Sequence, residues 1–83
     1  MKIYFETLSE ALEAHITSIQ KEGGVFVENP EDMYMCISPV GYGQTVQDHR
    51  ELATLKGKKT KKYAHFSIYR METGRYELTS YIS

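Results

Sequence analysis

Residues 63–83, YAHFSIYRMETGRYELTSYIS, decide the fold of this chain because apolar and polar side chains alternate on both sides of a Thr-Gly turn signal. Successive side chains of a β-strand point to opposite faces, so this alternation predicts two half-buried strands. The even positions carry the apolar side chains that one face would direct into a core: Ala64, Phe66, Ile68, Tyr76, Leu78 and Ile82. The stretch therefore predicts a C-terminal β-hairpin over residues 63–82.

The length of the hairpin loop decides whether both strands turn their apolar side chains to the same face. A two-residue loop at 73–74 would allow two surface ion pairs but would divide the apolar residues between the faces. A three-residue loop at 72–74 pairs Ile68 with Leu78 and places Gly74 in the left-handed position of a type I turn with a G1 bulge. An exposed ion pair contributes only ~0.2–1 kcal/mol, whereas a misplaced Phe or Leu costs ~1.5–3 kcal/mol. We therefore predict the three-residue loop.

The odd positions of the hairpin form a second face, on which aromatic side chains stand among polar ones. Tyr combines apolar area with a polar tip and is enriched at protein interfaces. A lysine-rich loop precedes the hairpin, and an arginine follows the hairpin loop. The candidate binding residues are therefore Tyr63, His65, Tyr69, Tyr81, Arg75, Lys58, Lys59, Lys61 and Lys62.

The length and composition indicate a single α+β domain over residues 1–83. A chain of 83 residues buries only ~60–65% of the surface that its unfolded form exposes. The chain must therefore bury its apolar side chains efficiently in its own core or share a core with a second copy. The apolar content of 41% and the charged content of 25% are those of a folded protein and exclude a disordered one.

The number of cysteines and the hydropathy of the chain indicate the cellular compartment in which we expect the protein. The single cysteine, Cys36, excludes a disulfide within the chain and is typical of a reducing compartment. The first six residues lack the apolar run of a signal peptide, and no segment approaches the ~20 apolar residues of a membrane span. We expect a soluble, cytoplasmic protein that does not associate with membranes.

The net charge of −1 hides an asymmetry between the two parts of the chain. Residues 1–50 hold three basic and eight acidic side chains, whereas residues 51–83 hold seven basic and three acidic ones. Such a polarised molecule can steer its partners or pair head to tail with itself. The lysines of residues 56–62 have two interpretations, a solvated loop that keeps a sheet edge soluble and a contact for phosphate or an acidic partner. We favour the first.

One helix is well defined by its ends. Thr7 is its predicted N-cap, and Glu10 completes a capping box. Leucines and isoleucines then recur at helical spacing over residues 8–22, with His15 at the margin of this stripe. Gly23 follows as the residue that ends the helix.

The remaining segments are shorter or ambiguous. Residues 2–6, 25–28 and 33–38 are predicted strands. Residues 46–56 are predicted as a second short helix, with Thr45 as N-cap and Gly57 past its end, and a strand is the alternative. The whole pattern predicts an α+β fold in which the helix packs on one face of a mainly antiparallel sheet, with the strand order left open.

No catalytic or cofactor-binding pattern stands out. The potential metal ligands His15, His49, His65 and Cys36 lie far apart in the sequence, so we predict no metal site. Cys36 is flanked by apolar residues and is predicted to be a structural thiol. The glycines lack the spacing of a dinucleotide fingerprint or a P-loop, so we predict no cofactor. We therefore predict a protein that is not an enzyme.

Two functions remain for the aromatic face of the hairpin. The first is a protein-interaction module that associates with itself or with another protein through this face. The alternative is a single-stranded nucleic-acid-binding protein, in which the rings stack on bases and the basic loop of residues 56–62 holds phosphates. We favour the interaction module, and a homo-oligomer in particular.

Overall fold

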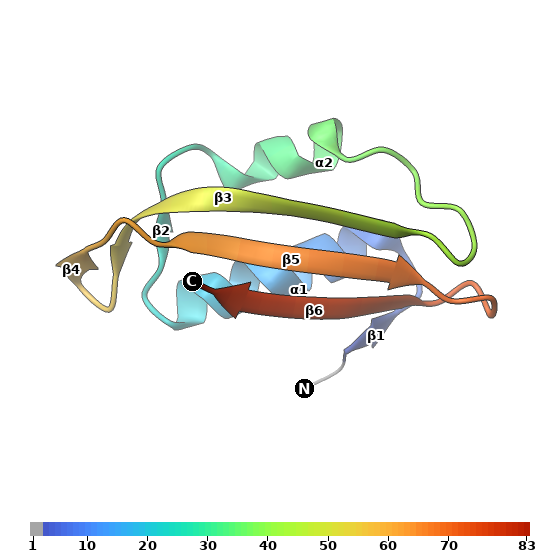
Figure 1. Cartoon of the computed structure of the whole chain (residues 1–83). Coiled ribbons are helices and arrows are strands. Elements are labelled where there is room, and N and C mark those ends of the chain that lie inside the picture. The colour runs from blue at the N-terminus through green and yellow to red at the C-terminus, as the bar shows by residue number, and fades with distance from the viewer. Residues whose placement is uncertain (1–2) are drawn as a thin grey trace.

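The computed structural model describes residues 3–83, apart from the side chain of Cys36. Its strands form an antiparallel sheet in the order β1-β6-β5-β3-β2, and the short strand β4 pairs with β3. The three long strands lie side by side in front of helix α1 (Figure 1). The elements are β1 (Tyr4–Phe5), α1 (Leu8–Lys21), β2 (Val25–Phe26), η1 (Pro30–Asp32), α2 (Met33–Cys36), β3 (Thr45–Leu55), β4 (Lys58–Lys59), β5 (Tyr63–Arg70) and β6 (Tyr76–Ile82). The predicted α+β class, with its helix packed on a mainly antiparallel sheet, is confirmed.

The C-terminal hairpin has the predicted register. Ile68 lies opposite Leu78, and Ala64 lies opposite Ile82. The N–H of Gly74 donates to the carbonyl of Met71 at 2.9 Å, and Gly74 has a φ of +94°. This is the left-handed position that the three-residue loop requires, and glycine adopts it without steric cost. Burial of the apolar side chains on one face has therefore determined the length of the hairpin loop.

Helix α1 begins as predicted and ends one residue earlier than expected. The hydroxyl of Thr7 accepts from the N–H of Glu10 at 3.1 Å and donates to the carboxylate of Glu10 at 3.2 Å. At the other end, the N–H of Gly23 donates to the carbonyl of Gln20 and the N–H of Gly24 donates to the carbonyl of Ile19, each at 3.0 Å. These two bonds form a Schellman motif, which satisfies carbonyls that the end of the helix leaves free.

The predicted second helix over residues 46–56 is wrong, and the alternative of a strand is what the structure contains. β3 pairs with β5 along most of its length, with Val46 opposite Ile68. Val46 and Leu52 face the core, and a helix over these residues would leave that edge of β5 without hydrogen-bonding partners. The two residues that follow β3, Lys56 and Gly57, have φ values of +53° and +80° and form the turn into β4. Gly57 therefore ends a strand rather than a helix.

The predicted strand over residues 33–38 is also wrong, because residues 30–36 form the short helices η1 and α2. Asn29 caps this segment through its side-chain oxygen, which accepts from the N–H of Glu31 at 3.0 Å. Met33 is fully buried, whereas Met35 is 89% exposed. The alternation of apolar residues that suggested a strand does not correspond to a buried face. β1 and β2 are shorter than the predicted strands 2–6 and 25–28, and Lys2 lies outside the described residues.

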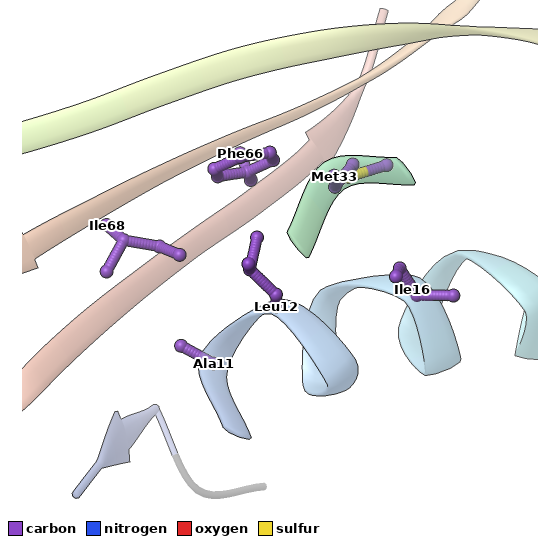
Figure 2. Close-up of a cluster of buried hydrophobic side chains, with 6 residues drawn as sticks. All are labelled: Ala11, Leu12, Ile16, Met33, Phe66 and Ile68. Atoms are coloured by element: carbon purple, nitrogen blue, oxygen red, sulfur yellow. The ribbon is translucent and has the colours of Figure 1, made fainter. Parts of the chain in front are cut away.

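The two clusters of the core lie between the helices and one face of the sheet. Leu12 of α1 points toward Phe66 and Ile68 of β5, and Met33 of α2 lies beside them (Figure 2). A second cluster joins Ile19 of α1 to residues of β3 and β5. Full burial of such a side chain contributes ~1.5–3 kcal/mol. The opposite face of the sheet takes no part in these clusters.

Candidate functional site

The face of the sheet that points away from α1 is the candidate site, and we call it the open face. Register places the odd-numbered residues of the three long strands together on this face. No helix in the described part of the chain covers it. The open face consists of Thr45, Gln47, His49, Glu51, Tyr63, His65, Ser67, Tyr69, Glu77, Thr79 and Tyr81.

Four rings of the open face form one contiguous group, the ring cluster, made of His49, Tyr63, His65 and Tyr81. His49, His65 and Tyr81 lie in register across β3, β5 and β6. The rings of His65 and Tyr81 are parallel to within 2°, with centroids 4.7 Å apart. His49 lies 5.6 Å from His65 and 5.5 Å from Tyr63. These separations fall in the range in which aromatic pairs attract.

Ser83, the last residue of the chain, is hydrogen-bonded to two members of the ring cluster. The hydroxyl of Ser83 forms a hydrogen bond of 2.7 Å with Nε2 of His65. The backbone of Ser83 exchanges two hydrogen bonds with that of Tyr63, at 2.8 and 3.0 Å. Because His65 is hydrogen-bonded and the other rings contact it or each other before any ligand arrives, we expect binding to cost less side-chain entropy than binding to separate rings.

The rings are accessible in the folded chain. Tyr63 is 39% exposed and Tyr81 is 53% exposed. Beside Tyr63, Val27, 53% exposed, helps line a shallow hollow of about 290 Å³. Arg50 borders the hollow and forms ion pairs with Asp48 at 3.4 Å and Glu28 at 3.7 Å, so this rim is internally neutralised.

The structure brings together only part of the predicted site. Tyr63, His65 and Tyr81 meet in the ring cluster. Tyr69 lies at the other end of β5, opposite Glu77. Arg75 lies in the hairpin turn, where its Nε is 3.2 Å from a carboxylate oxygen of Glu6.

The four predicted lysines lie at the opposite end of the sheet from Arg75. They belong to β4 and to the connection from β4 into β5, which begins at Tyr63. The eight residues of β5 span about 25 Å. Arg75 and the lysines therefore cannot contact the same few atoms of a ligand.

The sequence interpretation missed His49 as a member of the site. The predicted helix placed it on an apolar side, whereas β3 places it opposite His65. The signal that could have found it is the alternation over residues 45–52, in which Val46 and Leu52 share one parity and Thr45 and His49 share the other.

The third histidine belongs to the core and not to the open face. His15 is fully buried, with its Nδ1 2.6 Å from the hydroxyl of Ser80 and its ring 5.1 Å from that of Phe66. Burial, with a smaller contribution from the positive charge of His65, lowers the pKa of His15 to about 4. His15 is therefore neutral at physiological pH. Within residues 3–83, with Cys36 set aside, no three metal-ligating side chains converge.

The open face offers stacking surfaces, hydroxyl groups and two imidazoles to a partner. Comparisons of the chain with protein-family models, with curated proteins and with solved structures found no match. Among the described helices, none has the length and apolar character needed to cross a bilayer.

Proposed function

We propose that this protein is a non-enzymatic interaction module of the cytoplasm, one domain over residues 1–83, that self-associates through the open face. The observation that supports this proposal is the ring cluster, in which exposed tyrosines contact two imidazoles and one imidazole is hydrogen-bonded to Ser83. Rigid aromatic rings bury large areas at little cost in entropy. The core takes up only the other face of the sheet, so the rings are free for a second molecule.

Sheet-on-sheet packing is the geometry that such a face favours. Two sheets stack about 10 Å apart with interdigitating side chains. Three strands spaced at ~4.8 Å and ~25 Å long make a flat area of only a few hundred Å² on each copy. This is at the low end of specific interfaces, so we expect a dissociation constant in the micromolar range or weaker.

The test removes rings from the cluster and measures the mass in solution. Tyr63→Ser combined with Tyr81→Ser should abolish association, because both changes remove stacking area from the open face. Sedimentation velocity and light scattering from about 5 to 500 μM cover the affinity expected for a small interface. The matched control is Tyr34→Ser, which removes a ring of 39% exposure from α2 and should leave association unchanged.

A second variant distinguishes a loss of association from a loss of the fold. Ser67→Arg keeps all four rings and adds a bulky charge to the middle of the open face. It should also give a monomer with an unchanged circular dichroism spectrum. Association that survives both changes contradicts the proposal, as does a wild-type protein that stays monomeric at 500 μM.

A second candidate function is binding of single-stranded nucleic acid, favoured by the lysines that adjoin Tyr63. Lys58, Lys59, Lys61 and Lys62 could hold phosphates while bases stack on the ring cluster. A labelled 12-nucleotide single strand should then bind with an affinity that falls steeply with salt. Replacing the four lysines by alanine should weaken binding equally for all sequences. No binding at low salt eliminates this candidate and leaves self-association unaffected.

A further inference from the structure

The two ends of the sheet carry opposite charge. One end, which we call the lysine end, holds five lysines in the β3–β4 turn, in β4 and in the connection to β5: Lys56, Lys58, Lys59, Lys61 and Lys62. Within the described residues none of these five forms a salt bridge. The long strands run between this end and the β5–β6 turn (Figure 1).

The β5–β6 turn and its neighbours form the other end, which we call the turn end. Its three carboxylates lie with Arg70 and Arg75, so its formal charge is −1. Glu72 lies in the turn and Glu77 lies at the start of β6. Glu6 follows β1 and is paired with Arg75 at 3.2 Å. Glu72 and Glu77 have no salt bridge among the described side chains, so they are available to a cation from outside.

Two-fold symmetry allows two ways to stack a second copy on the open face. With the strands of the two copies parallel, each end lies over the same end of the other copy, so five lysines oppose five lysines. With the strands antiparallel, the lysine end of each copy lies over the turn end of the other. The molecule is 40 Å long, and charges are screened beyond ~8 Å at physiological ionic strength. The charges at each end therefore interact only with the charges of the end that lies against it in the other copy.

The side chains of β5 are compatible with the antiparallel arrangement. Four residues of β5 lie on the open face, in the order Tyr63, His65, Ser67 and Tyr69. A two-fold axis at their midpoint sets Tyr63 against Tyr69 of the second copy, and His65 against Ser67 of the second copy. Each such contact occurs twice, as an isologous interface requires. A Tyr–Tyr contact then lies at either side of the axis.

We propose that the partner of the open face is a second copy packed antiparallel, with the lysine end of each copy on the turn end of the other. This inference rests on the proposed self-association and adds its orientation and its charged contacts. Charge complementarity at an interface selects orientation and suppresses the wrong one. The lysines of residues 56–62 then serve as orientation contacts between copies.

Charge reversal tests the orientation directly. The first variant is Lys59→Glu with Lys61→Glu, and the second is Glu72→Lys with Glu77→Lys. In an antiparallel pair each variant alone sets like charges together twice, so its self-association should weaken about tenfold or more. An equimolar mixture of the two restores both attractive contacts and should associate to within about threefold of the wild type.

The outcomes separate this inference from the proposed function. If the wild type binds the first variant more tightly than it binds itself, the copies are parallel and the inference is wrong. If neither charge reversal alters an association that the ring variants abolish, the face is used without these charged contacts, and the inference is again wrong. A monomeric wild type removes the proposed function itself. Should the second variant fail to fold, Glu72→Lys alone replaces it, since Glu72 is exposed in the turn.

Discussion

At the scale of single residues, His15 shows how packing changes the chemistry of a side chain. The helical stripe placed it at the margin of the core, but the sheet covers it completely. Its Nδ1 has the hydroxyl of Ser80 as a partner, and its Nε2 is buried with no hydrogen-bond partner in the described structure. A protonated ring would therefore carry an unsatisfied buried charge, which is the physical cause of its low pKa.

We expect His15 to make the protein less stable in mild acid. Its pKa is lowered from 6.5 to about 4 in the folded chain, so the unfolded chain binds the extra proton between these values. The stabilisation is complete above pH 6.5 and is lost as the pH falls toward 4. Urea unfolding at pH 7.5 and 4.5 should show a loss of about 2–3 kcal/mol from this residue.

The variant His15→Leu isolates this contribution from that of the carboxylates. It leaves Ser80 without its ring partner, so it should be destabilised at pH 7.5. Its stability should nevertheless fall less between pH 7.5 and 4.5 than that of the wild type. Equal losses in the two proteins would show that His15 does not titrate in this range.

At the scale of elements, the end of α1 and the β3–β4 turn depend on each other. A Cβ atom added to Gly23 would lie 3.0 Å from both Cα and N of Lys56, which are backbone atoms. Gly57 has a similar φ of +80°, but an added Cβ would meet nothing within 4 Å. The two glycines therefore share one backbone requirement and differ in their packing.

This difference gives a matched pair of substitutions. Gly57→Ala should cost about 1 kcal/mol of unfolding free energy, the penalty for a side chain in the left-handed region. Gly23→Ala should cost at least about 2 kcal/mol, because it also forces the helix end away from the turn. Urea unfolding of both variants measures the difference. Equal losses would mean that the helix end and the turn do not support each other.

At the scale of the whole molecule, the uneven distribution of charge is the feature with functional consequences. The acidic residues of 1–50 and the basic residues of 51–83 nearly cancel in the net charge. The fold nevertheless collects five lysines at one end of the sheet and places three carboxylates with two arginines at the other. Net charge alone therefore conceals the polarity that the proposed pairing uses.

Salt should weaken self-association if the charged ends take part in it. Between 50 and 500 mM NaCl we expect the dissociation constant to rise about three- to tenfold, because the contacts between the ends are partly exposed and screened. Sedimentation equilibrium at several salt concentrations measures this change. An affinity that stays constant or rises with salt would indicate that the rings act without the charged ends.

The parts of the fold that could be predicted from the sequence are those with local causes. The register of the hairpin followed from the alternation of its side chains and from Gly74. The helix start followed from Thr7 and Glu10, which lie within one turn of each other. Three of the four rings of the cluster could be found in the same way, since Tyr63, His65 and Tyr81 belong to the hairpin.

The sequence by itself determined the hairpin, the capped helix and an aromatic face on the C-terminal strands, because neighbouring residues set periodicity, caps and turns. Only the tertiary structure decided that residues 45–55 form a strand and that residues 33–36 form a helix. A strand obtains its hydrogen bonds from distant residues, and β3 has β5 on one side and β2 on the other. That pairing brings His49 beside His65 and thereby completes the ring cluster. The alternation over residues 45–52 is compatible with this strand but does not decide it, because a strand is stable only when its partners are in place.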